Sequence, residues 1–196
     1  MTTTLHFPVS VDVPLREKRT YLHSTNLFDH LVARTGARQN LSLAFRRKIE
    51  CQVEALSAAD CEDADAFPAR FSGETANGSV DLVLREKQPL TPISWREPYN
   101  ENAAAYDAVI EGATVSSDKG NGASLIERIV SLNKRLLTEI SEGKKMLVFS
   151  KINLKSLPDK RARLKIHLKS RLGFKLFRSA IFANDEEVGE IIFYGT

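Results

Sequence analysis

This sequence has few cysteines, little aromatic character and no long hydrophobic run. Charged residues interrupt every apolar stretch well before the ~20 residues that a membrane-spanning helix needs, so we expect no membrane partner. The two cysteines, Cys51 and Cys61, have no histidine or cysteine cluster beside them, which excludes a disulfide framework and argues against a metal site. We interpret Cys51 as a small buried side chain rather than a nucleophile. The start of the chain has no basic segment followed by an apolar one, so we expect a cytoplasmic protein.

Motifs for cofactor chemistry are also absent. The sequence contains no phosphate-binding loop of the Walker type, no dinucleotide-binding glycine motif after a strand and no nucleophile-elbow serine. We therefore expect no cofactor. With 42% hydrophobic and 27% charged residues in 196 positions, the composition is that of a globular protein with one or two domains.

Periodicity predicts two similar passes along the chain. In the first, Ser24–Gly36 predicts a short helix, a long half-buried strand follows over Leu41–Glu54, and Asn77-Gly78 predicts a hairpin. Three prolines between Gln88 and Asn102 predict a linker. We place the first domain at residues 1–100 and the second at residues 101–196.

The second pass contains the clearest helix, over Ala123–Ile140. Its apolar residues share one broad face, and Arg128, Ser131 and Arg135 are predicted on the opposite, polar face. A strand over Ala105–Val115 is predicted before this helix. The strands predicted after it are 146–154, 162–168, 174–182 and 188–194. Helix and antiparallel strands in each half predict an α+β fold.

The element order and one motif resemble the hotdog superfamily. The segment Gly122-Ala-Ser-Leu-Ile-Glu-Arg-Ile-Val-Ser131 is similar to the central helix of 3-hydroxyacyl-ACP dehydratases. The resemblance implies a double hotdog, in which two helix-wrapped antiparallel sheets pack as a pseudo-dimer, with a homodimer as a further possibility. It also implies an acyl thioester ligand, on acyl carrier protein or coenzyme A, as in fatty acid or polyketide metabolism.

The resemblance implies site residues as well. Glu127 matches the catalytic carboxylate of the dehydratases. The family histidine is missing before Gly122, and His23 in the first half is the nearby substitute, while Asp29 would take the part of the carboxylate in the first helix. Thioesterases of this fold use a carboxylate to activate water, a role open to Glu127 or Asp29. Each residue has a structural alternative: Glu127 paired with Lys134 or Ser131, His23 on the surface or capping its helix, and Asp29 favouring the helix dipole.

Asn133 is the polar residue in the middle of the predicted apolar helix face. It either bonds backbone groups of the sheet or faces the ligand and orients a thioester carbonyl. Ser131 and Gly122 on the same segment are further ligand-binding candidates.

Positive charge is concentrated between Lys151 and Arg178, where ten basic residues accompany one acid. We expect this strand face to dock an acidic carrier protein or coenzyme A phosphates. The predicted docking residues are Arg161, Arg163, Lys165 and Lys169. The alternatives are a solvated strand face, a non-catalytic acyl-binding or assembly module, and nucleic-acid binding, against which the strand lacks aromatic residues on its polar face.

Overall fold

The computed structural model describes residues 8–118, 122–143 and 146–196. The first seven residues, to which the expectation of no export signal refers, lie outside this part of the chain. The chain divides into two compact units, Met1–Tyr99 and Asn100–Thr196. Within the described residues, no helix has both the length and the apolar character required to cross a membrane.

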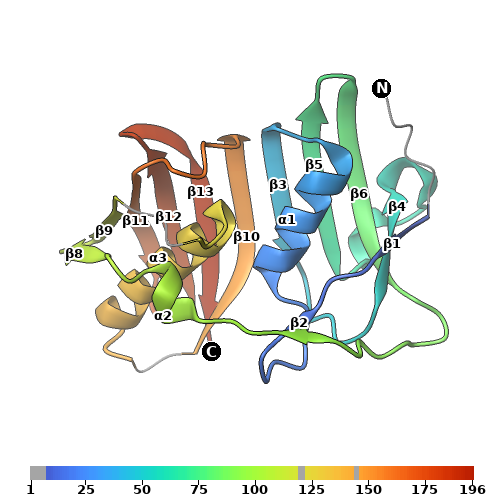
Figure 1. Cartoon of the computed structure of the whole chain (residues 1–196), viewed down its shortest axis with the longest axis horizontal. Helices are drawn as coiled ribbons and strands as arrows, with labels where there is room; N and C mark the ends of the chain where they lie inside the picture. Colours follow the sequence, from blue (N-terminus) through green and yellow to red (C-terminus); the bar gives the residue numbers. More distant parts are fainter. Residues whose placement is uncertain (1–7, 119–121, 144–145) are drawn as a thin grey trace. The chain divides into compact units, whose positions relative to one another are not determined.

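Unit 1 consists of a helix on an antiparallel sheet (Figure 1). Helix α1 spans Ser24–Thr35 and packs its Phe28 ring edge-on against Phe71 of β5, with the ring centroids 6.2 Å apart. The neighbouring strands follow the order β1, β4, β6, β5, β3. Their bounds are β1 Val9–Val11, β3 Gln39–Phe45, β4 Val53–Ser57, β5 Ala69–Thr75 and β6 Gly78–Glu86.

Smaller elements complete unit 1. A short parallel pair joins β2 (Leu15–Arg16) to β7 (Arg96–Glu97), the latter within the predicted linker. Two single turns of 3₁₀ helix, Ala58–Asp60 and Ala64–Ala66, occupy the acidic loop between β4 and β5.

One predicted strand of unit 1 is wrong in its extent. The segment Leu41–Glu54 forms β3, then leaves the sheet after Phe45, and returns as β4 at Val53. In between, the Ile49 carbonyl accepts from Leu22 N–H and the Gln52 N–H donates to Thr91. Burial still alternates at Ile49, Cys51 and Val53, because alternation reports which side chains face inward and not which chain they pair with.

Unit 2 repeats the arrangement with a longer helix. Helix α3 (Leu125–Ile140) packs against β9, β10, β11 and β12, and the short helix α2 (Glu101–Ala104) packs against α3. The strand order is β10, β13, β12, β11, β9, β8. The bounds are β8 Val109–Glu111, β9 Thr114–Ser117, β10 Leu147–Ser156, β11 Leu164–Leu172, β12 Leu176–Ala183 and β13 Glu186–Gly195.

The strand predicted over Ala105–Val115 is also wrong. Its first residues follow α2 in a turn, and the rest folds into the β8–β9 hairpin, with Glu111 opposite Thr114. Gly112 makes this turn possible with a φ of +58°, in the region that glycine adopts without strain. The hairpin predicted at Asn77-Gly78 is confirmed, and a second tight turn joins β12 to β13 at Asn184-Asp185.

Both units therefore have a helix laid on one face of an antiparallel sheet (Figure 1). This confirms the predicted α+β class and the helix-on-sheet arrangement of the hotdog fold. The packing of the two halves as a pseudo-dimer stays a prediction.

Candidate functional site

The start of α3 is fixed by a reciprocal pair of hydrogen bonds. Ser124 Oγ accepts from the Glu127 N–H at 3.2 Å, and Glu127 Oε2 accepts from the Ser124 N–H at 2.8 Å. This capping box satisfies two backbone donors that a helix start leaves without partners. Gly122 precedes it with a φ of +88° and is exposed. The carboxylate that the resemblance marks as catalytic therefore also holds the helix start.

Most of α3 is buried, including positions predicted to be polar and exposed. Ile129, Leu136 and Leu137 are fully buried, as the apolar face predicts. Arg128 and Ser131, however, are also buried, so the predicted polar face is wrong over the first half of the helix. Farther along the predicted polar face Arg135 is exposed, and its guanidinium donates to the Ala105 carbonyl at 2.7 Å.

Arg128 is a fully buried cation. Its Nη1 donates to the carbonyls of Lys160 and Ala162, at 2.9 and 3.1 Å, and ties α3 to the turn before β11. Its Nε and Nη2 have no hydrogen-bond partner in the described part of the chain. Burial lowers the pKa of the guanidinium, while the nearby Asp107 raises it. The sequence contains no local signal for this burial.

Asn133 is the most unusual polar group in unit 2. It is fully buried, and neither its amide nitrogen nor its amide oxygen has a partner among the residues that the structure describes. The residues one helical turn away, at i±3 and i±4, are all apolar and buried: Ile129, Val130, Leu136 and Leu137. The alternative in which Asn133 bonds the sheet backbone is therefore wrong.

A second polar group without a partner lies on the sheet of the same unit. Ser179 of β12 is fully buried, and its Oγ has no partner in the described residues. It lies on the same strand face as Phe177 and Ile181, both fully buried. Its register partners are Leu168 on β11 and Ile191 on β13, so apolar residues surround it within the sheet.

The first-half candidates lie at α1. His23 directly precedes the helix, is buried and gives no side-chain cap, so both structural alternatives for it are wrong. Its Nδ1 lies 2.7 Å from Thr25 Oγ1, and its ring lies 4.9 Å from that of Tyr99, centroid to centroid. Asp29 is half-buried and follows the first turn rather than lying in it. His23 and Asp29 belong to unit 1 and Glu127 to unit 2, and their catalytic pairing stays a prediction.

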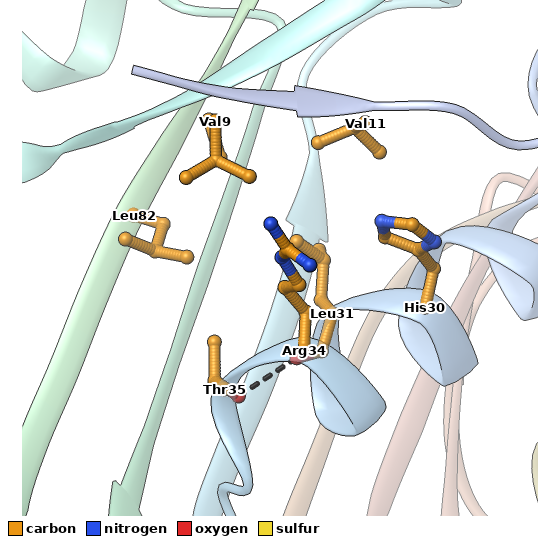
Figure 2. Close-up of a pocket in the computed structure, with 8 residues that line it drawn as sticks. Val9, Val11, His30, Leu31, Arg34, Thr35 and Leu82 are labelled. Carbon is orange, nitrogen blue, oxygen red and sulfur yellow. Dashed lines mark hydrogen bonds between the residues drawn. The ribbon is translucent and has the colours of Figure 1, made fainter. Parts of the chain in front are cut away.

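Unit 1 also contains a small apolar pocket with two basic side chains. Val9, Val11, Leu82 and Leu31 line a small space into which His30 and Arg34 of α1 point (Figure 2). His30 Nε2 has no partner in the described residues. Burial lowers the pKa of His30, the positive charge of Arg34 lowers it further, and Asp12 opposes both. Sequence reasoning assigned His30 no role.

The predicted docking residues are exposed or half-buried, and three of the four already have acidic partners. Arg163 and Lys165 both pair with Asp185, the latter at 3.4 Å, and Lys169 pairs with Glu187 at 2.7 Å. The bond from Lys169 lowers the pKa of Glu187. Arg161 is exposed and forms no ion pair with a described residue. The acids at the β12–β13 turn thus offset much of the positive charge that the sequence pattern suggested.

The chemistry available at the site is that of carboxylate, amide and guanidinium groups. Among the described residues, no group of three or more histidine, cysteine or acidic side chains is arranged to hold a metal ion. Cys51 is buried, as expected, and burial raises the pKa of its thiol; Cys61 is half-buried, and both thiols are free.

Comparisons with known proteins give structural neighbours only. No family model matches the chain, and no curated protein matches it. Three solved structures illustrate the neighbours. A monomeric dehydratase domain from a trans-AT polyketide synthase split module is 8% identical, with 95% of this chain and 96% of that chain covered and a TM-score of 0.45. The dehydratase domain of PpsC from Mycobacterium tuberculosis, in complex with C12:1-CoA, is 9% identical, with coverages of 82% and 76% and a TM-score of 0.44. An acyl-ACP thioesterase from Bacteroides thetaiotaomicron is 10% identical, with coverages of 96% and 95% and a TM-score of 0.42.

Proposed function

We propose that this protein binds acyl thioesters alongside α3, with Asn133 as the polar group that holds the thioester carbonyl. The single observation that carries the proposal is the fully buried Asn133 amide, which has neither a donor nor an acceptor partner in the described residues. A buried polar group without a partner costs about 1–3 kcal/mol. A ligand carbonyl that accepts from the amide would recover part of this cost.

The apolar surroundings of Asn133 support an acyl chain as the rest of the ligand. Ile129, Val130 and Leu137 flank it on the helix, and ligand sites are commonly apolar walls with a few polar groups that fix orientation. The resemblance of Gly122–Ser131 to the dehydratase helix points to the same ligand class, carried by acyl carrier protein or coenzyme A. Arg161, the predicted docking residue without an ion pair among described residues, is the first choice for contact with the carrier.

Ligand-induced stabilisation tests this proposal. A ligand at 100 times its Kd stabilises the folded state by about 2.7 kcal/mol, so saturating acyl-coenzyme A should raise the Tm of the wild type. Asn133→Leu should abolish the shift, and the matched control Thr138→Leu, an exposed position on the same helix, should retain it. Coenzyme A without an acyl group serves as the ligand control. Equal shifts in wild type and Asn133→Leu would contradict the proposal.

Dehydration of 3-hydroxyacyl thioesters is a second candidate, favoured by Glu127 at the start of α3. The carboxyl group would handle the departing hydroxyl, with hydrolysis by an activated water as the alternative. Glu127→Gln is a suitable probe, because glutamine also completes a capping box and the helix start is retained. We expect turnover of crotonyl- or 3-hydroxyacyl thioesters by the wild type and none by Glu127→Gln. Binding without turnover in the wild type would identify a non-catalytic acyl-binding module instead.

A further inference from the structure

Four large apolar side chains are exposed at one end of the unit 2 sheet. Their exposed fractions are 71% for Leu172, 63% for Met146, 49% for Tyr194 and 44% for Phe174. Leu172 and Phe174 belong to the turn that joins β11 to β12, with Gly173 between them at a φ of +55°. Exposed apolar residues that cluster in this way mark interaction surfaces more often than isolated ones do.

Backbone pairing brings these four residues to the same end of the sheet. Leu172 lies opposite Leu176, and Leu176 lies opposite Tyr194 on β13. Met146 exchanges backbone hydrogen bonds with Thr196, at 3.0 and 3.3 Å. We call the set Met146, Leu172, Phe174 and Tyr194 the sheet-end patch.

Gly195 holds the turn against the end of β13. Its N–H donates to the Lys175 carbonyl at 3.1 Å. A Cβ atom placed on Gly195 would lie 2.1 Å from the Phe174 carbonyl oxygen, a distance that no real side chain can adopt. The absence of a side chain at this position therefore lets the turn carrying Leu172 and Phe174 sit directly beside Tyr194.

Two basic side chains border the sheet-end patch. Arg171 lies over the Phe174 ring, 5.4 Å from its centroid, and Lys175 follows on the other side of the turn. Neither forms an ion pair with a described residue, in contrast to Lys169 and Arg178, which pair with Glu187 and Glu190. From Lys169 to Ala183 the sequence contains no acidic residue.

We propose that the sheet-end patch binds the surface of an anionic lipid membrane. Aromatic and aliphatic side chains insert at the headgroup level, and adjacent cations add attraction to anionic lipids. A lipid surface is the occupant that matches both features of the patch, because interfacial binding combines buried apolar side chains with attraction between cations and anionic headgroups. The sequence expectation of no membrane partner rested on the lack of a spanning segment, and peripheral binding does not need one.

Vesicle co-sedimentation tests the proposal with the full-length chain. Vesicles of phosphatidylcholine alone are compared with vesicles that also contain phosphatidylglycerol, at low and high salt. We expect the wild type to pellet with the anionic vesicles, to release at high salt and to stay in solution with phosphatidylcholine. Arg171→Gln combined with Lys175→Gln should weaken binding about 30-fold, because each cation near an anionic surface contributes about fivefold.

The apolar half of the patch is tested by Leu172→Ser combined with Phe174→Ser. The matched control is Leu90→Ser, at a leucine of unit 1 that is 62% exposed. We expect loss of binding in the first variant and wild-type binding in the control, with unchanged thermal unfolding in both. A second readout is a Phe174→Trp variant in a Trp95→Phe background, whose emission should shift to shorter wavelength with anionic vesicles. Three results would overturn the proposal: binding that does not depend on lipid charge, equal binding by all variants, and binding to an acidic protein but to no vesicle.

Discussion

The helices of the two units differ in how their buried polar groups are satisfied. At the start of α1, Asn26 accepts from Arg16 Nε at 2.5 Å and donates to the Pro14 carbonyl at 3.3 Å, while His23 contacts Thr25. In α3, the buried Asn133 has no partner in the described residues, and Arg128 uses only one of its three nitrogens.

This difference separates a structural polar cluster from a candidate binding group. The bonds of Asn26 fix where α1 begins and contribute to stability. The amide of Asn133 forms no hydrogen bond with the described residues, so nothing offsets the cost of its desolvation, which opposes folding. Polar burial alone therefore does not identify a site, whereas an amide that is buried without a partner in the described residues singles out Asn133 for testing.

The largest expected effect is on α1. Asn26→Ala should lower the free energy of unfolding by about 2 kcal/mol, because it removes the hydrogen bond from Arg16 Nε and the hydrogen bond to the Pro14 carbonyl. Urea denaturation measures the change. Asn26→Asp keeps the acceptor and should lose less. A loss below about 0.5 kcal/mol for the alanine variant would show that the Asn26 cluster is not structural.

The opposite sign is expected on α3. Asn133→Leu should raise the free energy of unfolding of the ligand-free protein by about 1.5 kcal/mol, because an apolar side chain replaces an amide without partners. The same urea experiment measures it. If Asn133→Leu destabilises as Asn26→Ala does, the amide has a structural partner and the contrast between the two helices disappears.

The capping box of α3 gives a smaller effect. Ser124→Ala should cost about 1 kcal/mol, because the Glu127 N–H loses its acceptor. Ser124→Asp keeps an acceptor at the same position and should restore most of the loss. The comparison of their Tm values tests the box independently of any ligand. Indistinguishable Tm values for wild type and Ser124→Ala would argue against it.

The smallest effect concerns His30. It differs from the polar residues at the start of α1 because its Nε2 has no partner in the described residues. Because its pKa in the folded state lies below its ordinary value of 6.5, the unfolded chain binds the proton more readily. The stability that depends on neutral His30 is present above pH 6.5 and is lost as the pH falls below it. His30→Gln should flatten this part of the stability profile. Arg34→Gln should weaken the dependence, and Asp12→Asn should strengthen it; a profile unchanged by all three would contradict this account.

Much of the helix architecture could be predicted from sequence because it is encoded locally. The 3.6-residue repeat placed α3 over Ala123–Ile140, two residues longer at its start than observed, and Asn133 was recognised in the middle of its apolar face. Arg128 was placed on the polar face instead, because periodicity sorts side chains by polarity alone. Its burial depends on Lys160, Ala162 and Asp107, which are distant in sequence and give no local signal.

The wrong extent of the strand predicted over Leu41–Glu54 has a similar cause. Leu41–Glu54 keeps its alternation through a segment that leaves the sheet, because loops at Leu22 and Thr91 supply the hydrogen bonds there. The ion pairs of Lys165 and Lys169 also depend on strand register, which brings the acids of the β12–β13 turn beside a basic strand. A count of charges along the sequence overstates the electrostatic potential at a strand face when the neutralising residues come from another strand.

The contact at Gly195 has a consequence for sequence variation. The turn residues Leu172 and Phe174 are exposed and can be exchanged at little cost to folding, whereas any substitution at Gly195 collides with the Phe174 carbonyl. A saturation mutagenesis scan scored for soluble expression should therefore find a tolerant turn next to one position that accepts glycine alone. When the same scan is scored for binding to anionic vesicles, the turn should become intolerant, because substitutions at Leu172 and Phe174 should reduce binding.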